Sequence, residues 1–151
     1  MIRLESPAFR HNGRIPSRYT CDGDNVSPPL MIHDVPEGTQ SLALIVEDPD
    51  VPTRVRSDGM WNHWILYNIQ PNVREIEEGK EPPGMPGTGT HGGKEYYGPC
   101  PPDREHRYFF KLFALSRILD LNPEPEKDEL EKAMEGHIIE KCELTGLYER
   151  S

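Results

Sequence analysis

The chain has 151 residues and a mass of 17.3 kDa, which suits a single domain with a buried core, so we predict one domain over residues 1–151. Its 17 Lys and Arg against 26 Asp and Glu give a formal net charge of -9, which disfavours a nucleic-acid-binding surface. Sixteen prolines and thirteen glycines lie between short apolar runs, a composition typical of strands joined by turns, so we predict a mainly β fold.

The cysteines and the apolar runs indicate in which cellular compartment the protein is expected. Cys21, Cys100 and Cys142 are too few and too scattered for a disulfide framework or for a zinc site with paired ligands. Their odd number suits a reducing compartment and leaves at most one internal bridge. No apolar run approaches the roughly 18 residues of a spanning helix, and the first residues lack the apolar core of a signal peptide. We therefore expect a cytoplasmic protein with no membrane span.

The first third of the chain is predicted to hold turns and then a buried strand. Residues 9–36 are rich in Pro, Gly, Asn and Asp, as in "CDGDNVSPPL", and predict turns with one or two short strands. The following "SLALIVED", residues 41–48, is nearly all apolar and too short for an isolated helix, so we predict a strand buried on both faces. Pro49 and Pro52 end it.

Two further strands are predicted on either side of a long loop. "WNHWILYNI", residues 61–69, is rich in aromatic and β-branched residues. In "HRYFFKLFAL", residues 106–115, the period of two places His106, Tyr108 and Phe110 on one face of a strand and Arg107 and Phe109 on the other. Between them "EEGKEPPGMPGTGTHGGKEYYGP" reads as a Gly/Pro loop, and loops of that length are usually functional or mobile.

The C-terminal part is predicted to be helical. In "NPEPEKDELEKAMEGHIIEKC" the residues of one face recur at spacings of three and four, and acidic residues lie at the start. The face comprises Leu130, Met134, His137, Ile138 and Cys142. We predict an amphipathic helix over this segment, followed by a short strand or an extended tail in "ELTGLYER".

Polar side chains at the ends of the predicted strands are the candidate functional residues. Asp48, His63, His106 and Tyr108 each lie near a proline-rich turn, where a rigid scaffold commonly holds binding groups. One acid and two histidines suit a phosphate or carboxylate, because protonated histidines supply N–H donors. The same three residues also suit a divalent metal or acid–base catalysis.

Each of these residues also has an ordinary structural interpretation. His63 between two tryptophans suits a buried, hydrogen-bonded histidine, and Asp48 before Pro49 suits a turn. His106 and Tyr108 suit a packed pair on one strand face. Cys100 has no base next to it in sequence, which favours a packed small side chain over a reactive thiol.

In combination, the motifs "YTCDGDNVSPPL", "DPDVP", "WNHWILYNI", "GPCPP", "HRYFFKLFAL" and "AMEGHIIEKCELTGLY" resemble the phosphatidylethanolamine-binding protein family, in its bacterial and archaeal Raf kinase inhibitor-like branch. The resemblance covers essentially the whole chain. It implies a Greek-key antiparallel β-sandwich with a C-terminal helix and a small anion pocket at the strand ends.

Carried over residue by residue, the resemblance implies which side chains line that pocket. Asp48, His63, His106 and Tyr108 would form it, and Trp61 would supply an apolar wall. The turn through Gly98, Cys100 and Pro102 would present backbone groups at the rim, and Tyr148 matches a tyrosine that closes the pocket in some relatives.

The implied function is binding of a small anionic or phosphorylated ligand without a cofactor, with regulation of a kinase or protease partner and a homodimeric state. The alternative is a hydrolase that uses Asp48, His63 and His106 in acid–base or metal-assisted catalysis. No serine or cysteine nucleophile adjoins these residues in sequence, so we predict no catalytic residue and no metal. The run Asp103, Arg104 and Glu105 replaces residues that are commonly small in relatives and changes the charge at the pocket mouth.

Overall fold

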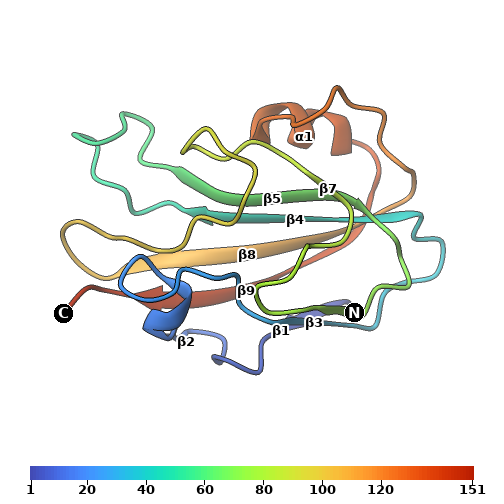
Figure 1. Cartoon of the computed structure of the whole chain (residues 1–151). Helices are drawn as coiled ribbons and strands as arrows, with labels where there is room; N and C mark the ends of the chain where they lie inside the picture. Colours follow the sequence, from blue (N-terminus) through green and yellow to red (C-terminus); the bar gives the residue numbers. More distant parts are fainter.

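The computed structural model describes residues 1–151 as two β-sheets with one α-helix (Figure 1). The larger sheet has the strand order β2-β9-β8-β4-β5-β7, and the smaller has the order β1-β3-β6. The elements are β1 (Arg3–Glu5), β2 (Gly13–Arg14), the 3-10 helix η1 (Ser17–Tyr19), β3 (Leu30–His33), β4 (Ser41–Asp48), β5 (Trp61–Ile69), β6 (Glu75–Ile76), β7 (Met85–Pro86), β8 (His106–Leu115), α1 (Lys127–Met134) and β9 (Ile138–Tyr148). The mainly β fold with a C-terminal helix is confirmed, whereas the Greek-key description of the connections stays a prediction.

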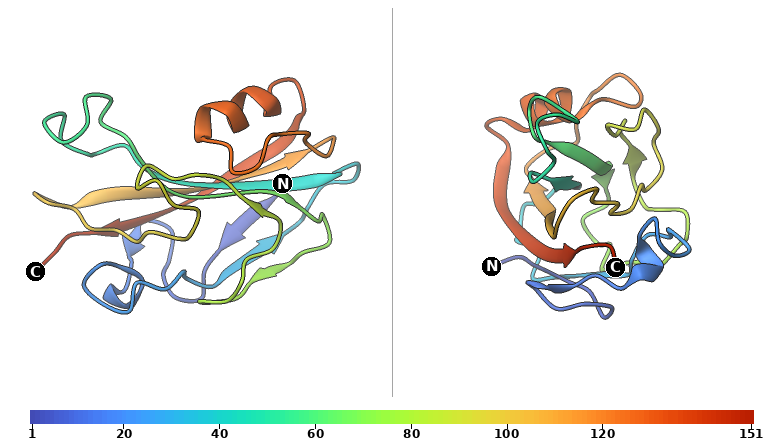
Figure 2. Two further views of the ribbon diagram at one scale, coloured as in Figure 1. Left: turned by 45° about the horizontal axis from the view of Figure 1, so that its top comes forward. Right: turned by 90° about the vertical axis from the view of Figure 1, so that its left-hand side faces the viewer.

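Strand β4 lies in the middle of the larger sheet and is buried along its whole length, as its apolar sequence predicts. Leu42, Leu44 and Val46 face the main core between the two sheets. Ala43 and Ile45, on the opposite face, contact a second core that α1 covers. A strand with apolar side chains on both faces can be buried only where both faces are covered, which is the arrangement in Figure 2.

The predicted strands 61–69 and 106–115 are confirmed with the same bounds, as β5 and β8. Both pair antiparallel with β4, and the register places Asp48 opposite Trp61 and Glu47 opposite Phe109. The end of β4 and the starts of β5 and β8 therefore meet at one edge of the molecule. The loop after β4 and the loop before β8 extend from this edge, at the left of Figure 1.

The predicted C-terminal helix is confirmed only over Lys127–Met134, and the prediction that it extends to Cys142 was wrong. A capping box between Glu126 and Glu129 starts the helix. Glu135, with φ -53° and ψ 130°, leaves the helical conformation and Gly136 has φ +77°, which ends the helix. Beyond this turn, residues 138–148 form the long strand β9 against β8. The ladder of backbone hydrogen bonds with β8 outweighs the helical spacing of the side chains there.

The segments between the long strands hold small elements. Residues 9–36 contain β2 and β3, as predicted, whereas β1 was not predicted and pairs with β3. The Gly/Pro loop 77–99 contributes the two-residue strand β7 at the edge of the larger sheet. None of the helices has the length and hydropathy needed to cross a membrane.

Candidate ligand-binding site

A cavity of about 230 Å³ lies where β4, β5 and β8 meet. Six of the nine predicted site residues line it: Asp48, Trp61, His63, Cys100, Pro102 and His106. Four residues that the sequence did not single out complete the lining: Val51, Val55, Tyr97 and Pro101. The structure therefore brings together residues from three strands and two loops that are far apart in sequence.

His106 lies between two carboxylates. Its Nδ1 is 2.6 Å from Asp48 Oδ2, and its Nε2 is 2.7 Å from Asp103 Oδ1. A carboxylate oxygen accepts hydrogen bonds, so both ring nitrogens donate and the geometry describes an imidazolium. The His106 side chain is 1 % exposed and that of Asp48 is 4 %, whereas that of Asp103 is 27 % exposed. His106 thus has one fully buried partner and one partner at the protein surface.

The buried partner, Asp48, is held in place by a local turn. Its Oδ1 accepts a 2.8 Å hydrogen bond from the backbone N–H of Asp50. Burial raises the pKa of the Asp48 carboxyl, and the hydrogen bonds from His106 and from the Asp50 backbone oppose this shift. A charged Asp48 therefore depends on these two hydrogen bonds.

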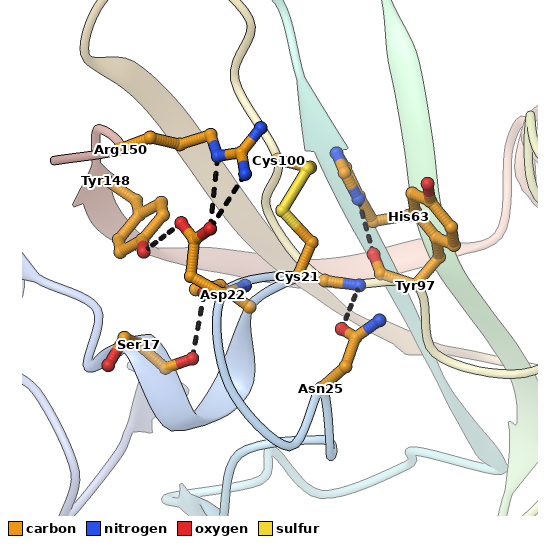
Figure 3. Close-up of a disulfide and its surroundings, with 11 residues drawn as sticks. Ser17, Cys21, Asp22, Asn25, His63, Tyr97, Cys100, Tyr148 and Arg150 are labelled. Atoms are coloured by element: carbon orange, nitrogen blue, oxygen red, sulfur yellow. Dashed lines mark hydrogen bonds and ion pairs between the residues drawn. A yellow bond between two sulfur atoms is a disulfide. The ribbon is translucent and has the colours of Figure 1, made fainter.

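His63 differs from His106 in its charge. Its Nδ1 is 2.5 Å from the Tyr97 carbonyl oxygen, so this nitrogen carries the proton and donates it (Figure 3). Burial lowers the pKa of His63 to about 4, so the ring is neutral at neutral pH. Its Nε2 is then a hydrogen-bond acceptor, and this atom is buried without a partner in the protein. The expectation that both histidines donate as cations is wrong for His63, because burial excludes its charge.

Aromatic side chains surround the two histidines. The Tyr108 ring meets His63 edge-on at 5.4 Å between ring centroids and stacks on His106 at 6.3 Å. Tyr97 stacks on His63 at 6.1 Å and lies 6.3 Å from Trp61. Tyr108 is behind the histidines and does not line the cavity. Its burial raises the pKa of its hydroxyl, which keeps the proton and lacks a partner in the protein.

The rim of the cavity is tied to the loop that follows η1. A disulfide joins Cys21 and Cys100 (Figure 3). The Cys21 backbone N–H donates to the Pro99 carbonyl at 3.1 Å. The Gly98 N–H donates to Asn25 Oδ1 at 2.9 Å. The odd cysteine count left room for one internal bridge, and Cys100 belongs to it, so Cys100 is neither a reactive thiol nor a free packed side chain. Sequence alone could not pair these cysteines, because 79 positions separate them.

Two of the remaining predicted residues lie beside the cavity and not on its wall. Gly98 approaches the η1 loop so closely that a Cβ atom would lie 2.3 Å from both Asn25 Oδ1 and the Tyr19 carbonyl oxygen. The Tyr148 hydroxyl donates to Asp22 Oδ2 at 2.6 Å, on the outer side of the disulfide (Figure 3). Gly98 thus supports the rim, and Tyr148 does not close the cavity in this conformation.

The structure gives no support to the catalytic alternative. No group of three or more His, Cys, Asp and Glu side chains is arranged to hold a metal ion. The sulfur of Cys100 is bonded to Cys21, so it is not a thiol nucleophile.

Comparisons with known proteins agree with one another. The family model described as "Phosphatidylethanolamine-binding protein" matches residues 5–149. A UPF0098 protein of Chlamydia pneumoniae is 53 % identical over 150 residues, covering 99 % of this chain and 100 % of the relative. A UPF0098 protein of Methanothermobacter thermautotrophicus is 47 % identical, covering 99 % of each chain.

Two solved structures share the fold over nearly their full length. CT736 from Chlamydia trachomatis superposes with a TM-score of 0.97 at 47 % identity, covering 99 % of this chain and 98 % of that chain. YbcL of E. coli, described as a member of the mammalian PEBP family, superposes with a TM-score of 0.88 at 28 % identity, covering 99 % of each chain.

Proposed function

Because the chain belongs to the phosphatidylethanolamine-binding protein family, we propose that it binds a small phosphorylated group in the cavity between β4, β5 and β8. One observation carries the proposal. His106 bonds the buried Asp48 through Nδ1, and its Nε2 donates to a carboxylate oxygen of Asp103. An oxyanion already accepts from this nitrogen, so the direction and charge of the donor suit an anionic ligand.

The neutral His63 narrows the chemistry of that ligand. A group that fits between the two histidines accepts a hydrogen bond from His106 Nε2 and donates one to His63 Nε2. A monoprotonated phosphoryl group does both, because it carries P–O⁻ and P–OH oxygens. A carboxylate lacks the donor. The family name points to phosphoethanolamine as a candidate form of this group.

The size and walls of the cavity agree with a small group. Its volume of about 230 Å³ is below the roughly 300–1,000 Å³ of common ligand pockets. Trp61, Tyr97 and Val55 supply an apolar wall beside the polar atoms. This wall accommodates a short substituent on the phosphoryl group, whereas an acyl chain would exceed the space.

The test is a titration of isotope-labelled protein with inorganic phosphate, phosphoethanolamine and phosphotyrosine, followed through the side-chain nitrogen resonances of His63 and His106. We expect both to shift in the millimolar range or below. Asp48→Asn keeps the side-chain shape but removes the carboxylate that bonds His106 Nδ1, and it should abolish the shifts. Asp120→Asn, an exposed acid, is the matched control. Unchanged spectra of the unsubstituted protein at millimolar ligand would refute the proposal.

The same proposal includes three further properties. Regulation of a kinase or protease and a homodimeric state follow from the family resemblance, and a cytoplasmic location follows from the composition. Inhibition assays against both enzyme classes and sedimentation of the purified chain test the first two. The Cys21–Cys100 disulfide is a feature more typical of oxidising compartments, so localisation by fractionation is an independent test of the third.

A further inference from the structure

Asp103 occupies the position on His106 that an anionic ligand needs. Its Oδ1 is the acceptor, at 2.7 Å, for the one His106 proton that is not bonded to Asp48. Both donors of the imidazolium are therefore bonded within the protein. A ligand that takes the Nε2 proton has to replace the Asp103 carboxylate.

We propose that Asp103 is a specificity-determining residue, an intramolecular competitor that admits phosphoryl groups and excludes carboxylates. This inference rests on the proposed function. It assigns to Asp103 a role separate from those of the lining residues, because Asp103 reaches the ligand position from outside the cavity.

The carboxylate has somewhere to go when it is replaced. Asp103 belongs to the exposed turn 102–105 and lines a polar cleft of about 430 Å³ on the outer side of Pro101 and Pro102. The same two prolines line the inner cavity. Arg104 and Arg150 line the cleft, and Arg104 Nε is 3.8 Å from the other carboxylate oxygen of Asp103. Arg150 is already paired with Asp22 at 3.0 Å, so a rotation of the Asp103 side chain toward Arg104 would free His106 without unfolding a strand.

The selectivity follows from the bonds that each ligand gains. A free carboxylate makes the same bond to His106 as Asp103 does, but Asp103 is tethered three residues away and acts at an effective concentration in the millimolar range or above. A monoprotonated phosphoryl group gains a second bond, its P–OH donating to His63 Nε2. Only a ligand with this additional bond competes well against the tethered carboxylate.

Inorganic phosphate and acetate are the probes, titrated separately into four proteins by calorimetry and by NMR of the histidine side chains. In the unsubstituted protein we expect phosphate to bind and acetate to be undetectable. Asp103→Ala removes the competitor and should tighten phosphate binding about tenfold, the value of one charge-assisted hydrogen bond. Asp103→Asn keeps a weaker, neutral acceptor, so its phosphate affinity should lie between that of the unsubstituted protein and that of Asp103→Ala. Acetate binding should become measurable in Asp103→Ala.

Glu105→Gln is the matched control, because the Glu105 side chain makes no hydrogen bond and lies two residues from Asp103, so the change removes only one negative charge. We expect phosphate affinity within about twofold of the unsubstituted value, since exposed charges are strongly screened. A gain equal to that of Asp103→Ala would show that net charge, and not the bond to His106, sets the affinity, and it would overturn the inference.

The remaining outcomes separate the inference from the function beneath it. If the unsubstituted protein and Asp103→Ala bind phosphate equally, the competitor role of Asp103 is wrong and the proposed function stands. If none of the four proteins binds phosphate, both are wrong. Folding of each variant is checked by thermal unfolding. Independently of any ligand, the His106 Nε2–H resonance should move in Asp103→Ala, and an unchanged resonance would overturn the inference.

Discussion

Asp50 and Arg107 form a two-point ion pair that fixes the loop after β4 to the start of β8. Asp50 Oδ2 accepts from Arg107 Nε at 2.9 Å and from the Arg107 backbone N–H at 2.8 Å, and Asp50 Oδ1 accepts from Nη2 at 2.8 Å. Because the Asp50 N–H donates to Asp48, this pair also sets the position of Asp48 beside His106. The second aspartate of "DPD" thus orients the first.

Arg107→Lys should destabilise the protein by about 1 kcal/mol at neutral pH, because a lysine cannot make the two parallel bonds and Arg107 is itself half exposed. Arg107 holds the pKa of Asp50 below 3.8, so the contribution is present above that pH and is lost as the pH falls through the folded-state value. Urea unfolding measures both effects. Arg56→Lys, in the exposed Arg56–Asp58 pair, is the control, and an equal loss in the two variants would contradict the prediction.

Protonation of His63 should destabilise the fold in mildly acidic solution. Its pKa is 6.5 in an unfolded chain and about 4 in the folded protein, because burial disfavours the charged ring. Between these values the unfolded state binds the extra proton, so the free energy of unfolding decreases as the pH falls from 6.5 to 4, by on the order of 3 kcal/mol.

Comparison with His63→Phe isolates this effect, since both proteins share every other titrating group. The unfolding free energy of the unsubstituted chain should decrease more steeply between pH 6.5 and 4 than that of the variant. If the unfolding free energies of the two proteins fall in parallel with pH, His63 is not the group that causes the loss of stability. The titration of the His63 resonance gives the pKa directly.

The strands that form the site could be predicted closely from sequence, and the reason is local. Residues 41–48, 61–69 and 106–115 are apolar or aromatic runs bounded by proline-rich turns, and the observed strands have those same bounds. Antiparallel pairing then brings Asp48, His63 and His106 to one edge. The side-chain periodicity and the turn residues therefore determine where these strands begin and end.

The features that sequence did not predict depend on contacts between distant segments. Tyr97 follows a Gly-rich loop without periodicity, and only the fold places its carbonyl on His63. The sequence indicated a change of charge at Asp103, but only the folded turn before β8 places its carboxylate on His106. Likewise the spacing of Ile138 and Cys142 is helical, and only the pairing with β8 makes them part of a strand.

The Cys21–Cys100 disulfide should stabilise the rim and the whole fold. It closes a loop of 79 positions, for which the chain-entropy treatment gives about 4.5 kcal/mol relative to the reduced chain. Replacement of both cysteines by serine should therefore lower the melting temperature strongly. The control is Cys142→Ser, which removes the half-buried free thiol.

Alkylation provides a second measurement on the unsubstituted chain. In denaturant without reductant a single cysteine, Cys142, should be labelled, and after reduction all three should be. Labelling of three cysteines without reductant would show that the bridge does not form under the conditions used.

Gly98→Ala should loosen the contact between the rim and the η1 loop by steric conflict. The added Cβ would lie 2.3 Å from the Tyr19 carbonyl oxygen and from Asn25 Oδ1, so the backbone of one segment has to move. We expect a loss of about 1–3 kcal/mol, typical of overpacking, together with weaker phosphate binding because the Cys100 and Pro102 side of the cavity shifts. Gly38→Ala is the control: its Cβ would meet no atom within 4 Å, so only the strain of its φ of +86° remains. Phosphate affinity should be unchanged in Gly38→Ala, and a Gly98→Ala protein that binds phosphate normally would show that the rim does not position the site.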